Sequence, residues 1–290
     1  MKLEVKPAGT LEKPVRVGRL EHPAIAESSG IVASRRHGGV YWTMNDSGSP
    51  PRIYAVDEAG KCLRAVHLRG ARNRDWEDIA ADSDGMLYVA DVGDNARTRK
   101  GLTIYCLPEP DPKGKGPAAV KFARSFRYPA GHGPFDCEAV FVRRGWAYLV
   151  TKERARAGLY RVALAGKAGE TGEAEFLGTL SGAAWVTAAD ISPDGRRIAV
   201  LTYLSVMVYE LPAPPEKVFA PPASGPASRP AGTGRSVAIR RRWRLVRLGQ
   251  CEAICWRPPA AGAGLLITNE GRDVYRIPPT AAATRPATSP

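Results

Sequence analysis

An all-β fold, a five-bladed β-propeller, is predicted by three observations on the 290-residue chain. A phrase in which an acidic residue meets small and apolar residues returns at intervals of about 50 to 62 residues. Each copy is followed by short strand-like runs between turns, and the 30 glycines and 25 prolines suit many tight turns. No segment shows the 3.6-residue hydrophobic period of a long helix. Self-similarity at this spacing is typical of a propeller with one blade per repeat.

The repeated phrase predicts the first strand of each blade. Its copies begin at Glu27, Glu77, Glu138, Ala189 and Glu252. In the fourth copy Ala189 takes the glutamate position, and the acid, Asp190, is shifted by one residue. We expect these strands to line the central axis of the propeller.

The other strands follow in order behind each phrase. Second strands are expected within 39–46, 85–95, 146–153, 197–203 and 264–270. Third strands are expected within 52–57, 102–109, 158–164, 206–212 and 273–279. Four of the units also have a fourth strand, within 62–68, 119–128, 174–180 and 240–249. Each unit therefore predicts one four-stranded blade.

The fifth unit stops after its third strand, at Pro278 and Pro279. Its missing outer strand is predicted at the other end of the chain, in Val15–Leu20, where pairing would close the ring. The spacing of the repeat fits five blades better than six, which is the alternative if one degenerate unit is present.

The domain organisation follows from the repeat. One propeller domain is expected over residues 15–279, after an N-terminal extension over 1–14. Residues 212–236 are rich in Pro, Ala, Ser and Gly and predict a flexible loop between the third and fourth strands of blade 4. Residues 280–290 predict a disordered tail. Neither segment carries enough apolar residues to order itself.

Charge and composition limit the partners. The net charge of +13 permits anionic partners without naming one. The basic run within 240–249 alternates like an outer edge strand, where basic residues oppose aggregation, so nucleic acid is not the expected partner. The sequence contains no run of about eighteen apolar residues, so no membrane-spanning helix is predicted. A small anionic ligand or a protein is the expected partner.

Compartment and assembly are inferred from the ends and the cysteines. The first fourteen residues lack the apolar core of an export signal. Five cysteines without a CxxC pair do not make a full disulfide framework. We expect a cytoplasmic monomer, or a periplasmic or secreted one if a signal peptide has been removed.

Two sets of polar residues are expected on one face of the propeller. The second strand runs antiparallel to the first, so the start of the first strand and the end of the second lie together. The first set contains the acids of the repeated phrase, with Asp75 and Asp136 just before two of them. The second set, at the ends of the second strands, contains Asn45, Asp46, Asp91, Asp94, Asn95, Lys152, Thr202, Tyr203, Asn269 and Glu270.

Carboxylates that converge on one axis cannot all stay ionised and unpaired, so they favour a bound cation. Ca²⁺ tolerates a flexible ring of six to eight oxygen ligands better than Mg²⁺ does. The predicted metal ligands are Glu27, Glu77, Glu138, Asp190 and Glu252. Blade 4 could instead offer a backbone carbonyl or the Thr187 hydroxyl. The alternative is that the acids cap strand starts and accept hydrogen bonds from backbone N–H groups of neighbouring blades.

The five-blade count and the repeated glutamate resemble the calcium-activated nucleotidase (apyrase) family. Glu252-Ala-Ile-Cys-Trp256 is similar to that family's fifth-blade phrase, and a fourth blade without its glutamate is similar too. The resemblance implies Glu77, Glu138 and Glu252 as Ca²⁺ ligands, with a first-blade contact from Glu27 and Ser28. The phrases ESSGI, NDSG, DWEDIA, DVGDN and SPDGRR also resemble uncharacterised bacterial phytase-like and esterase-like propellers.

Basic residues surround the acids in the sequence. The predicted ligand-binding residues are Asn45, Arg72, Arg74, Trp76, Asn95, Arg97, Arg154 and Asn269. An acidic metal centre with a basic rim suits a phosphorylated or carboxylated ligand, because Arg pairs with such groups through two hydrogen bonds. The other tryptophans, Trp185 among them, are expected to pack between blades.

Three functions follow as hypotheses. One is a metal-dependent hydrolase of an anionic ester, with Asp46, Asp91, Asp94 and Lys152 as catalytic residues that position water or stabilise charge. Another is a non-catalytic propeller that binds a ligand or a protein around a structural metal. A lactonase similar to the gluconolactonase propellers is a third reading, which six blades would favour. The sequence contains no GxSxG, HExxH or P-loop motif that would choose among them.

Overall fold

The computed structural model describes residues 13–167, 169–213, 215–218, 235–237, 239–245 and 248–278. Five β-sheets make up this part of the chain, and they form a five-bladed propeller as predicted. Residues 1–12, 168, 214, 219–234, 238, 246–247 and 279–290, and with them the predicted tail, lie outside the described residues. Within the predicted loop 212–236, a single helical turn, α1 (Pro215–Val218), and a short strand, β19 (Arg235–Val237), are formed.

The first three blades each contain four antiparallel strands. Blade 1 has β2 (Ser28–Ala33), β3 (Tyr41–Asn45), β4 (Arg52–Val56) and β5 (Cys62–Arg69). Blade 2 has β6 (Trp76–Ala81), β7 (Met86–Asp91), β8 (Leu102–Pro108) and β10 (Phe122–Arg127). Blade 3 has β11 (Cys137–Arg143), β12 (Trp146–Thr151), β13 (Gly158–Ala163) and β15 (Glu175–Leu180).

The last two blades differ in their outer strand. Blade 4 has β16 (Val186–Ile191), β17 (Arg197–Thr202), β18 (Ser205–Glu210) and β20 (Ile239–Arg244). Blade 5 has β21 (Cys251–Trp256), β22 (Leu265–Asn269) and β23 (Asp273–Ile277), with a 3₁₀ turn at Pro259–Ala261. Its fourth strand is β1 (Val15–Arg19), which pairs antiparallel with β23. The predicted closure of the ring by the N-terminal strand is therefore confirmed.

Short parallel strands join blades 2, 3 and 4 to the blade before them, and they are additional to the predicted strands. β9 (Ala118–Ala119) of the blade 2 connection pairs with β5, and β14 (Gly172–Glu173) of the blade 3 connection pairs with β10. β19 pairs with β15 in the same way. In blade 1 the turn after β4 makes the contact with the preceding blade 5. The N–H of Arg19, at the end of β1, donates to the Ala59 carbonyl in this turn at 2.9 Å. The outer edges so covered are less open to strand pairing with another chain.

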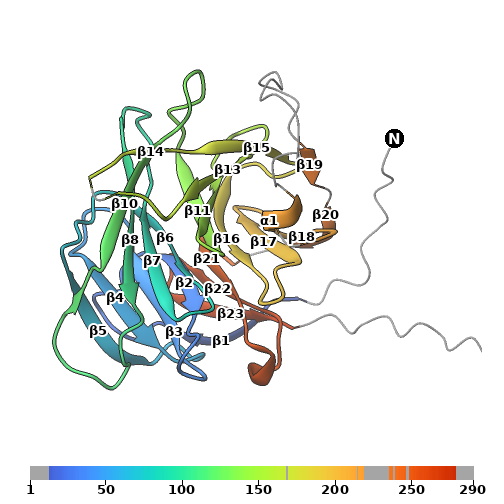
Figure 1. The fold of residues 1–290 in the computed structure, drawn as a ribbon. Helices are drawn as coiled ribbons and strands as arrows, with labels where there is room; N and C mark the ends of the chain where they lie inside the picture. The colour runs from blue at the N-terminus through green and yellow to red at the C-terminus, as the bar shows by residue number, and fades with distance from the viewer. Residues whose placement is uncertain are drawn as a thin grey trace, which may run out of the picture.

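The hydrophobic core is divided into five parts, one between each pair of neighbouring blades. The innermost strands β2, β6, β11, β16 and β21 contact one another around the axis, where Figure 1 shows them at the centre of the sheets. Trp42 and Trp76 are fully buried in the core between blades 1 and 2, and Trp256 is buried between blades 4 and 5. The inter-blade packing expected of the other tryptophans holds for Trp42 and Trp256, and Trp76, which was predicted to bind ligand, packs there too.

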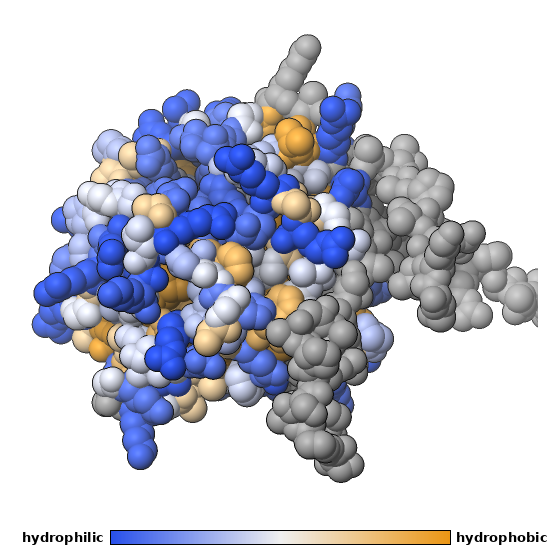
Figure 2. Space-filling view, turned by 90° about the horizontal axis from the view of Figure 1, so that it is seen from above, coloured by the Kyte–Doolittle hydropathy of each residue, from blue (hydrophilic) through white to orange (hydrophobic). Residues whose placement is uncertain are grey.

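Figure 2 shows a mostly hydrophilic face on which apolar residues are scattered. All five cysteines carry free thiols. Among the described residues, no helix has the length and apolar character needed to cross a membrane.

One irregularity is repeated in all five blades and positions the site. The pairing of the first strand with the second shifts by one residue near its start, between Ser28 and Gly30 in blade 1 and at equivalent points in the others. An extra residue of this kind is a β-bulge, which disrupts the ladder locally and re-aims a side chain. The residues at the bulge are Ser29, Glu77, Glu138, Thr187 and Glu252.

Closure of the ring predicts a sensitive position at Gly18 in β1. A Cβ atom at Gly18 would lie 1.9 Å from the Ala59 carbonyl oxygen, so Gly18→Ala must displace backbone. Overpacking of this kind costs about 1–3 kcal/mol, and thermal melts should show a lower Tm. Gly38→Ala is the matched control, because a Cβ there meets nothing within 4 Å. Equal melting temperatures for the two variants would contradict the role given to β1.

Candidate metal centre

The bulge residues belong to a repeated pattern around the mouth of the axis. Two positions before the bulge stand Glu27, Asp75, Asp136, Trp185 and Gln250. Just after the end of each second strand stand Asp46, Val92, Lys152, Tyr203 and Glu270. The two strands are antiparallel, so all three sets lie at the same end of the propeller. The predicted convergence of strand-one starts and strand-two ends is visible in the pairing of Ser28 with Asn45 and of Cys251 with Asn269.

A cavity of about 210 Å³ lies at this mouth. Its lining is almost entirely polar and comes from blades 1, 2, 3 and 5: Glu27, Ser28, Ser29, Asp46, Glu77, Asn95, Glu138, Lys152, Gln250, Glu252 and Glu270. Six of these side chains are carboxylates and one is an ammonium group. The cavity is therefore acidic within a protein that is basic overall.

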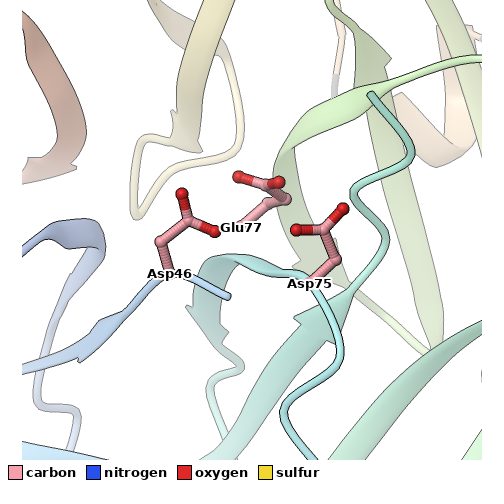
Figure 3. Close-up of side chains that lie close together, drawn as sticks. All are labelled: Asp46, Asp75 and Glu77. Atoms are coloured by element: carbon pink, nitrogen blue, oxygen red, sulfur yellow. The ribbon is translucent and has the colours of Figure 1, made fainter. Parts of the chain in front are cut away.

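Two groups of three carboxylates approach closely enough to share an ion. Asp46, Asp75 and Glu77 form one group, and Figure 3 shows their carboxylates turned toward a common space. Glu77, Asp136 and Glu138 form the second, with all three residues buried. Within each group the ligand oxygens lie within 4.8 Å of one another. Glu77 belongs to both groups and is the centre of the cluster.

Burial and mutual repulsion perturb these acids. Burial, with the charges of Glu138, Asp46 and Asp75, raises the pKa of Glu77 well above its usual value. Burial, with the charge of Asp46, raises the pKa of Asp75 to about 6. Burial raises the pKa of Glu138 to about 8 although Lys152 opposes the shift. A cation bound among the oxygens would favour the ionised forms instead.

Lys152 supplies one cation from the chain itself. Its ammonium group donates to the Glu138 carboxylate, and both side chains are largely buried. Burial lowers the pKa of Lys152, but the adjacent Glu138 raises it above the usual value. Glu252 has its pKa raised to about 7 by burial, with a Gln250 hydrogen bond and Lys152 acting against the rise. Lys152 thus compensates the side of the cavity nearest Glu138 and Glu252, while Asp46, Asp75 and Glu77 have no such partner in the pocket lining.

The donor set fits a hard divalent cation. Every candidate ligand atom in the two groups is a carboxylate oxygen. Two oxygens on opposite sides of one Ca²⁺ ion lie about 4.6–5.2 Å apart, because each Ca–O bond is about 2.3–2.6 Å long. Oxygens that lie within 4.8 Å of one another can therefore share one Ca²⁺ ion. Glu77, with Asp75 and Asp46 or with Asp136 and Glu138, would hold the ion.

Four of the five predicted metal ligands line the cavity: Glu27, Glu77, Glu138 and Glu252. Asp190 does not. Its two carboxylate oxygens accept hydrogen bonds from the backbone N–H groups of Ile191, at 2.7 Å, and of Trp256 in blade 5, at 2.8 Å. The alternative role considered for the repeated acids, bonding to the backbone of a neighbouring blade, is the one that Asp190 has.

The strand register also corrects the alignment of blade 4. Thr187, and not Ala189 or Asp190, occupies the bulge position equivalent to Glu77. The Thr187 hydroxyl donates to the Cys251 carbonyl at 2.9 Å, so it ties two blades together. In blade 1 the equivalent residue is Ser29, whose hydroxyl lies 3.0 Å from the Glu77 carbonyl. Glu27 is the counterpart of Asp75 instead.

Of the acids predicted to position water, only Asp46 lines the cavity. Asp91 is buried in an ion pair with Arg99 at 2.7 Å. The Asp94 carboxylate accepts hydrogen bonds from the N–H groups of Thr98 and Arg99. The Asp94 N–H in turn donates to Asp136 at 2.9 Å, so this loop orients an acid of the cluster.

The predicted ligand-binding residues are mostly at the periphery. Asn95 lines the cavity. Asn45 and Asn269 donate to the carbonyls of Ala24 and Leu248 and fix loops. Trp76 is fully buried, with its indole N–H donating to the Arg72 carbonyl.

The predicted basic rim lies outside the pocket lining. Arg72 and Arg74 are exposed beside Asp75. Arg97 pairs with Glu153 at 3.0 Å. Arg154 lies over the ring of Trp185, 5.2 Å from its centroid.

Several residues of the site were not singled out by the sequence as ligands. Asp75 and Asp136 complete the two carboxylate groups, and their signal was the spacing Asp-x-Glu shared by blades 2 and 3. Gln250 and Glu270 line the cavity beside Glu252. Trp185, expected to pack between blades, is 40% exposed.

Comparison with known proteins identifies the fold and no family. No protein-family model and no curated protein matches the chain. Among solved structures, the major allergen Mala s 1 of Malassezia sympodialis is similar with a TM-score of 0.54 and 9% identity, over 93% of this chain and 96% of that one. Hydrazine synthase of Kuenenia stuttgartiensis has a TM-score of 0.40 and 13% identity, over 93% of this chain and 68% of that one. At such identities the likeness to Mala s 1 concerns the fold alone. The resemblance to calcium-activated nucleotidases stays a prediction.

The raised pKa values predict how stability depends on pH when metal is removed. In the folded protein Asp75 keeps its proton up to about pH 6, Glu252 up to about pH 7 and Glu138 up to about pH 8. In the unfolded chain ordinary carboxyl groups lose their protons near pH 4. The folded state then binds more protons, so the free energy of unfolding falls as the pH rises through this window. Thermal melts in chelator between pH 5 and 8 should show a falling Tm, and Asp75→Asn should flatten the lower part of the curve. A Tm that rises with pH, or an identical curve for the variant, would contradict the assigned pKa shifts.

Proposed function

We propose that the acidic cavity is a Ca²⁺ site and that the protein uses it to bind a small anionic ligand. The observation that carries the proposal is the pair of carboxylate groups that share Glu77. Buried carboxylates in contact are costly unless protons or a cation compensate them. Lys152 compensates one side of the cavity only.

Calcium suits this site better than magnesium. The candidate ligands come from blades 1, 2 and 3, and they are held by loops and strand ends. Ca²⁺ accepts irregular geometry with six to eight oxygens, whereas Mg²⁺ demands a near-ideal octahedron with bonds of about 2.0–2.1 Å. Two oxygens across one Mg²⁺ ion would lie only about 4.0–4.2 Å apart, which leaves less freedom for five carboxylates.

The anionic nature of the ligand is supported by the rim. A negatively charged ligand cannot enter the carboxylate-lined cavity unless a cation reverses the local charge. Arg72 and Arg74 are exposed and precede Asp75 closely in the chain, and such guanidinium groups suit the outer part of a phosphate or carboxylate group.

Hydrolysis of the ligand is a second candidate, and the position of Asp46 favours it. Asp46 is half-buried at the cavity wall and belongs to the first carboxylate group. A bound Ca²⁺ would polarise a phosphoryl or carbonyl oxygen of an ester. Asp46 would orient a water molecule for attack and accept its proton. The non-catalytic module remains the alternative.

The metal proposal predicts opposite effects of one substitution with and without calcium. Glu77→Gln makes the centre of the cluster permanently neutral, so in chelator, above the pH at which Glu77 ionises, the variant should melt at a higher temperature than the wild type. In Ca²⁺ at about one hundred times its Kd, the wild type should gain about 2.7 kcal/mol, and the variant should gain little. Differential scanning calorimetry measures both effects. Glu21→Gln, at an exposed acid outside the cavity, should behave as the wild type. A wild-type Tm that is the same in Ca²⁺ and in chelator would exclude the site.

The catalytic proposal predicts phosphate or acid release that depends on Asp46. A screen of phosphate monoesters and carboxylic esters at saturating Ca²⁺ should find one substrate that Asp46→Asn turns over at least about tenfold more slowly. Calcium affinity of the variant, measured in parallel by calorimetry, separates loss of chemistry from loss of metal. Turnover that Asp46→Asn leaves unchanged would refute the role of Asp46, and no turnover with any ester would favour the binding module.

A further inference from the structure

Blade 4 breaks the acidic pattern of the mouth and replaces it with aromatic residues. Trp185 occupies the position that is Glu27, Asp75 or Asp136 in blades 1 to 3. Tyr203 follows the second strand of blade 4 where Asp46 and Glu270 follow those of blades 1 and 5. Thr187 stands at the bulge in place of glutamate. One side of the mouth is therefore aromatic, while blades 1, 2, 3 and 5 supply the carboxylates.

Trp185 is held in an uncommon and exposed conformation. Its φ angle is +54°, in the left-handed region that bulky residues seldom adopt, and it is 40% exposed. Its backbone N–H donates to the Glu153 carbonyl at 2.9 Å. The Glu153 side chain pairs with Arg97, which also has a positive φ, of 55°. Contacts with loops of blades 2 and 3 therefore hold Trp185 at the surface. Packing between blades would have buried its side chain. Backbone strain of this kind is concentrated at functional sites.

Tyr203 extends the same surface. The rings of Trp185 and Tyr203 have centroids 6.1 Å apart and planes inclined by 33°. Leu204, the next residue, is 73% exposed. The turn is rigid, because the Thr202 hydroxyl accepts hydrogen bonds from the N–H groups of Leu204 and Ser205. Trp185 and Tyr203 form what we call the aromatic platform.

Lys152 connects the aromatic platform with the acidic cavity. It lines the cavity and donates to Glu138, and its ammonium nitrogen lies 5.0 Å from the centroid of the Tyr203 ring. Arg154 lies over Trp185 in a similar way, at 5.2 Å. Each ring is therefore an electron-rich surface that already attracts a cation. Tyr203 therefore lies next to the cavity wall, since Lys152 contacts both its ring and the Glu138 carboxylate.

We propose that the aromatic platform binds the pyranose ring of a sugar whose polar groups enter the acidic cavity. The C–H groups on one face of a pyranose carry partial positive charge, and they pack on the negative face of an aromatic ring. The hydroxyl groups at its edge donate hydrogen bonds, and Glu252, Glu270 and the Gln250 amide on the nearby wall accept them. Arg154 supplies donors on the other side of the platform.

The geometry favours a puckered sugar over a flat heterocycle. A planar base can lie parallel to only one of two rings that are inclined by 33°. A chair-shaped pyranose presents C–H groups in several directions and can contact both rings. The acceptor-rich cavity wall also suits several hydroxyl donors better than the few polar edges of a base.

For a phosphorylated or acidic sugar, the inference rests on the proposed function, because its charged group would sit on the metal. The ring contact itself needs no metal. A neutral sugar should therefore bind weakly in chelator, and a sugar phosphate should bind more tightly when Ca²⁺ is added.

The test is isothermal calorimetry of the full chain with glucose, glucuronate, glucose 6-phosphate and adenosine, each in Ca²⁺ and in chelator. We expect at least one sugar to bind and Trp185→Ala to weaken its binding at least tenfold. Trp146→Ala is the matched control: Trp146 is half-buried, with Arg161 stacked on it at 4.3 Å, but begins β12 at the opposite end of the strand from Thr151. It should leave sugar affinity unchanged. Thermal melts verify that both variants are folded.

The outcomes separate the two proposals. Sugar binding that requires Trp185 but is the same in chelator would support the aromatic platform and refute the metal-dependent ligand. Calcium binding without any sugar binding would refute the platform and leave the metal centre standing. Adenosine binding in place of sugar binding, or sugar binding that Trp185→Ala does not change, would also overturn the inference.

Discussion

The β-bulge at the start of each innermost strand is the local feature from which the site is built. One extra residue per blade stands at Ser29, Glu77, Glu138, Thr187 and Glu252, and in every blade but the fourth its side chain lines the cavity. The residue two positions earlier faces the same mouth in blades 2 and 3, so Asp75 and Asp136 join the glutamates. The rigid ring of five inter-blade cores holds these strand ends in place. The carboxylates of different blades lie close together because the five blades close into a ring.

The chemistry of the mouth differs from blade to blade on the same geometry. Blades 1 to 3 place five carboxylates in two groups around Glu77. Blade 3 adds Lys152, which neutralises the Glu138 side, and blade 4 adds Trp185 and Tyr203 in positions that are acidic in three and in two of the other blades. The charge to be compensated is therefore off the axis, toward blades 1 to 3, and the apolar contact lies on the side of blade 4. A ligand held between them would touch a cation at one end and rings at the other, as small-molecule sites with a few fixed polar groups do.

Much of the fold could be read from the sequence, and less of the site. The recurring phrase and the missing fourth strand of the last unit predicted five blades and the closure by Val15–Arg19, because these depend on residue type and spacing. The bulge has no such signature, so the equivalence of Thr187 and Glu77 was missed, and Asp190 was assigned to the axis although it bonds the backbone of blade 5. The parallel strands β9, β14 and β19 are two or three residues long and too short for a pattern. The exposure of Trp185 depends on its φ angle and on Glu153, which sequence spacing does not encode.

The central claim is that a cation, and not protons alone, compensates the carboxylates around Glu77. A crystal of the full chain grown in Ca²⁺ tests it most directly, through anomalous scattering recorded at a wavelength where calcium contributes. The account predicts one strong peak about 2.3–2.6 Å from a Glu77 oxygen and from oxygens of Asp75 and Asp46 or of Asp136 and Glu138. Density without a peak among these residues at saturating Ca²⁺, or a peak bound elsewhere on the surface, would contradict it.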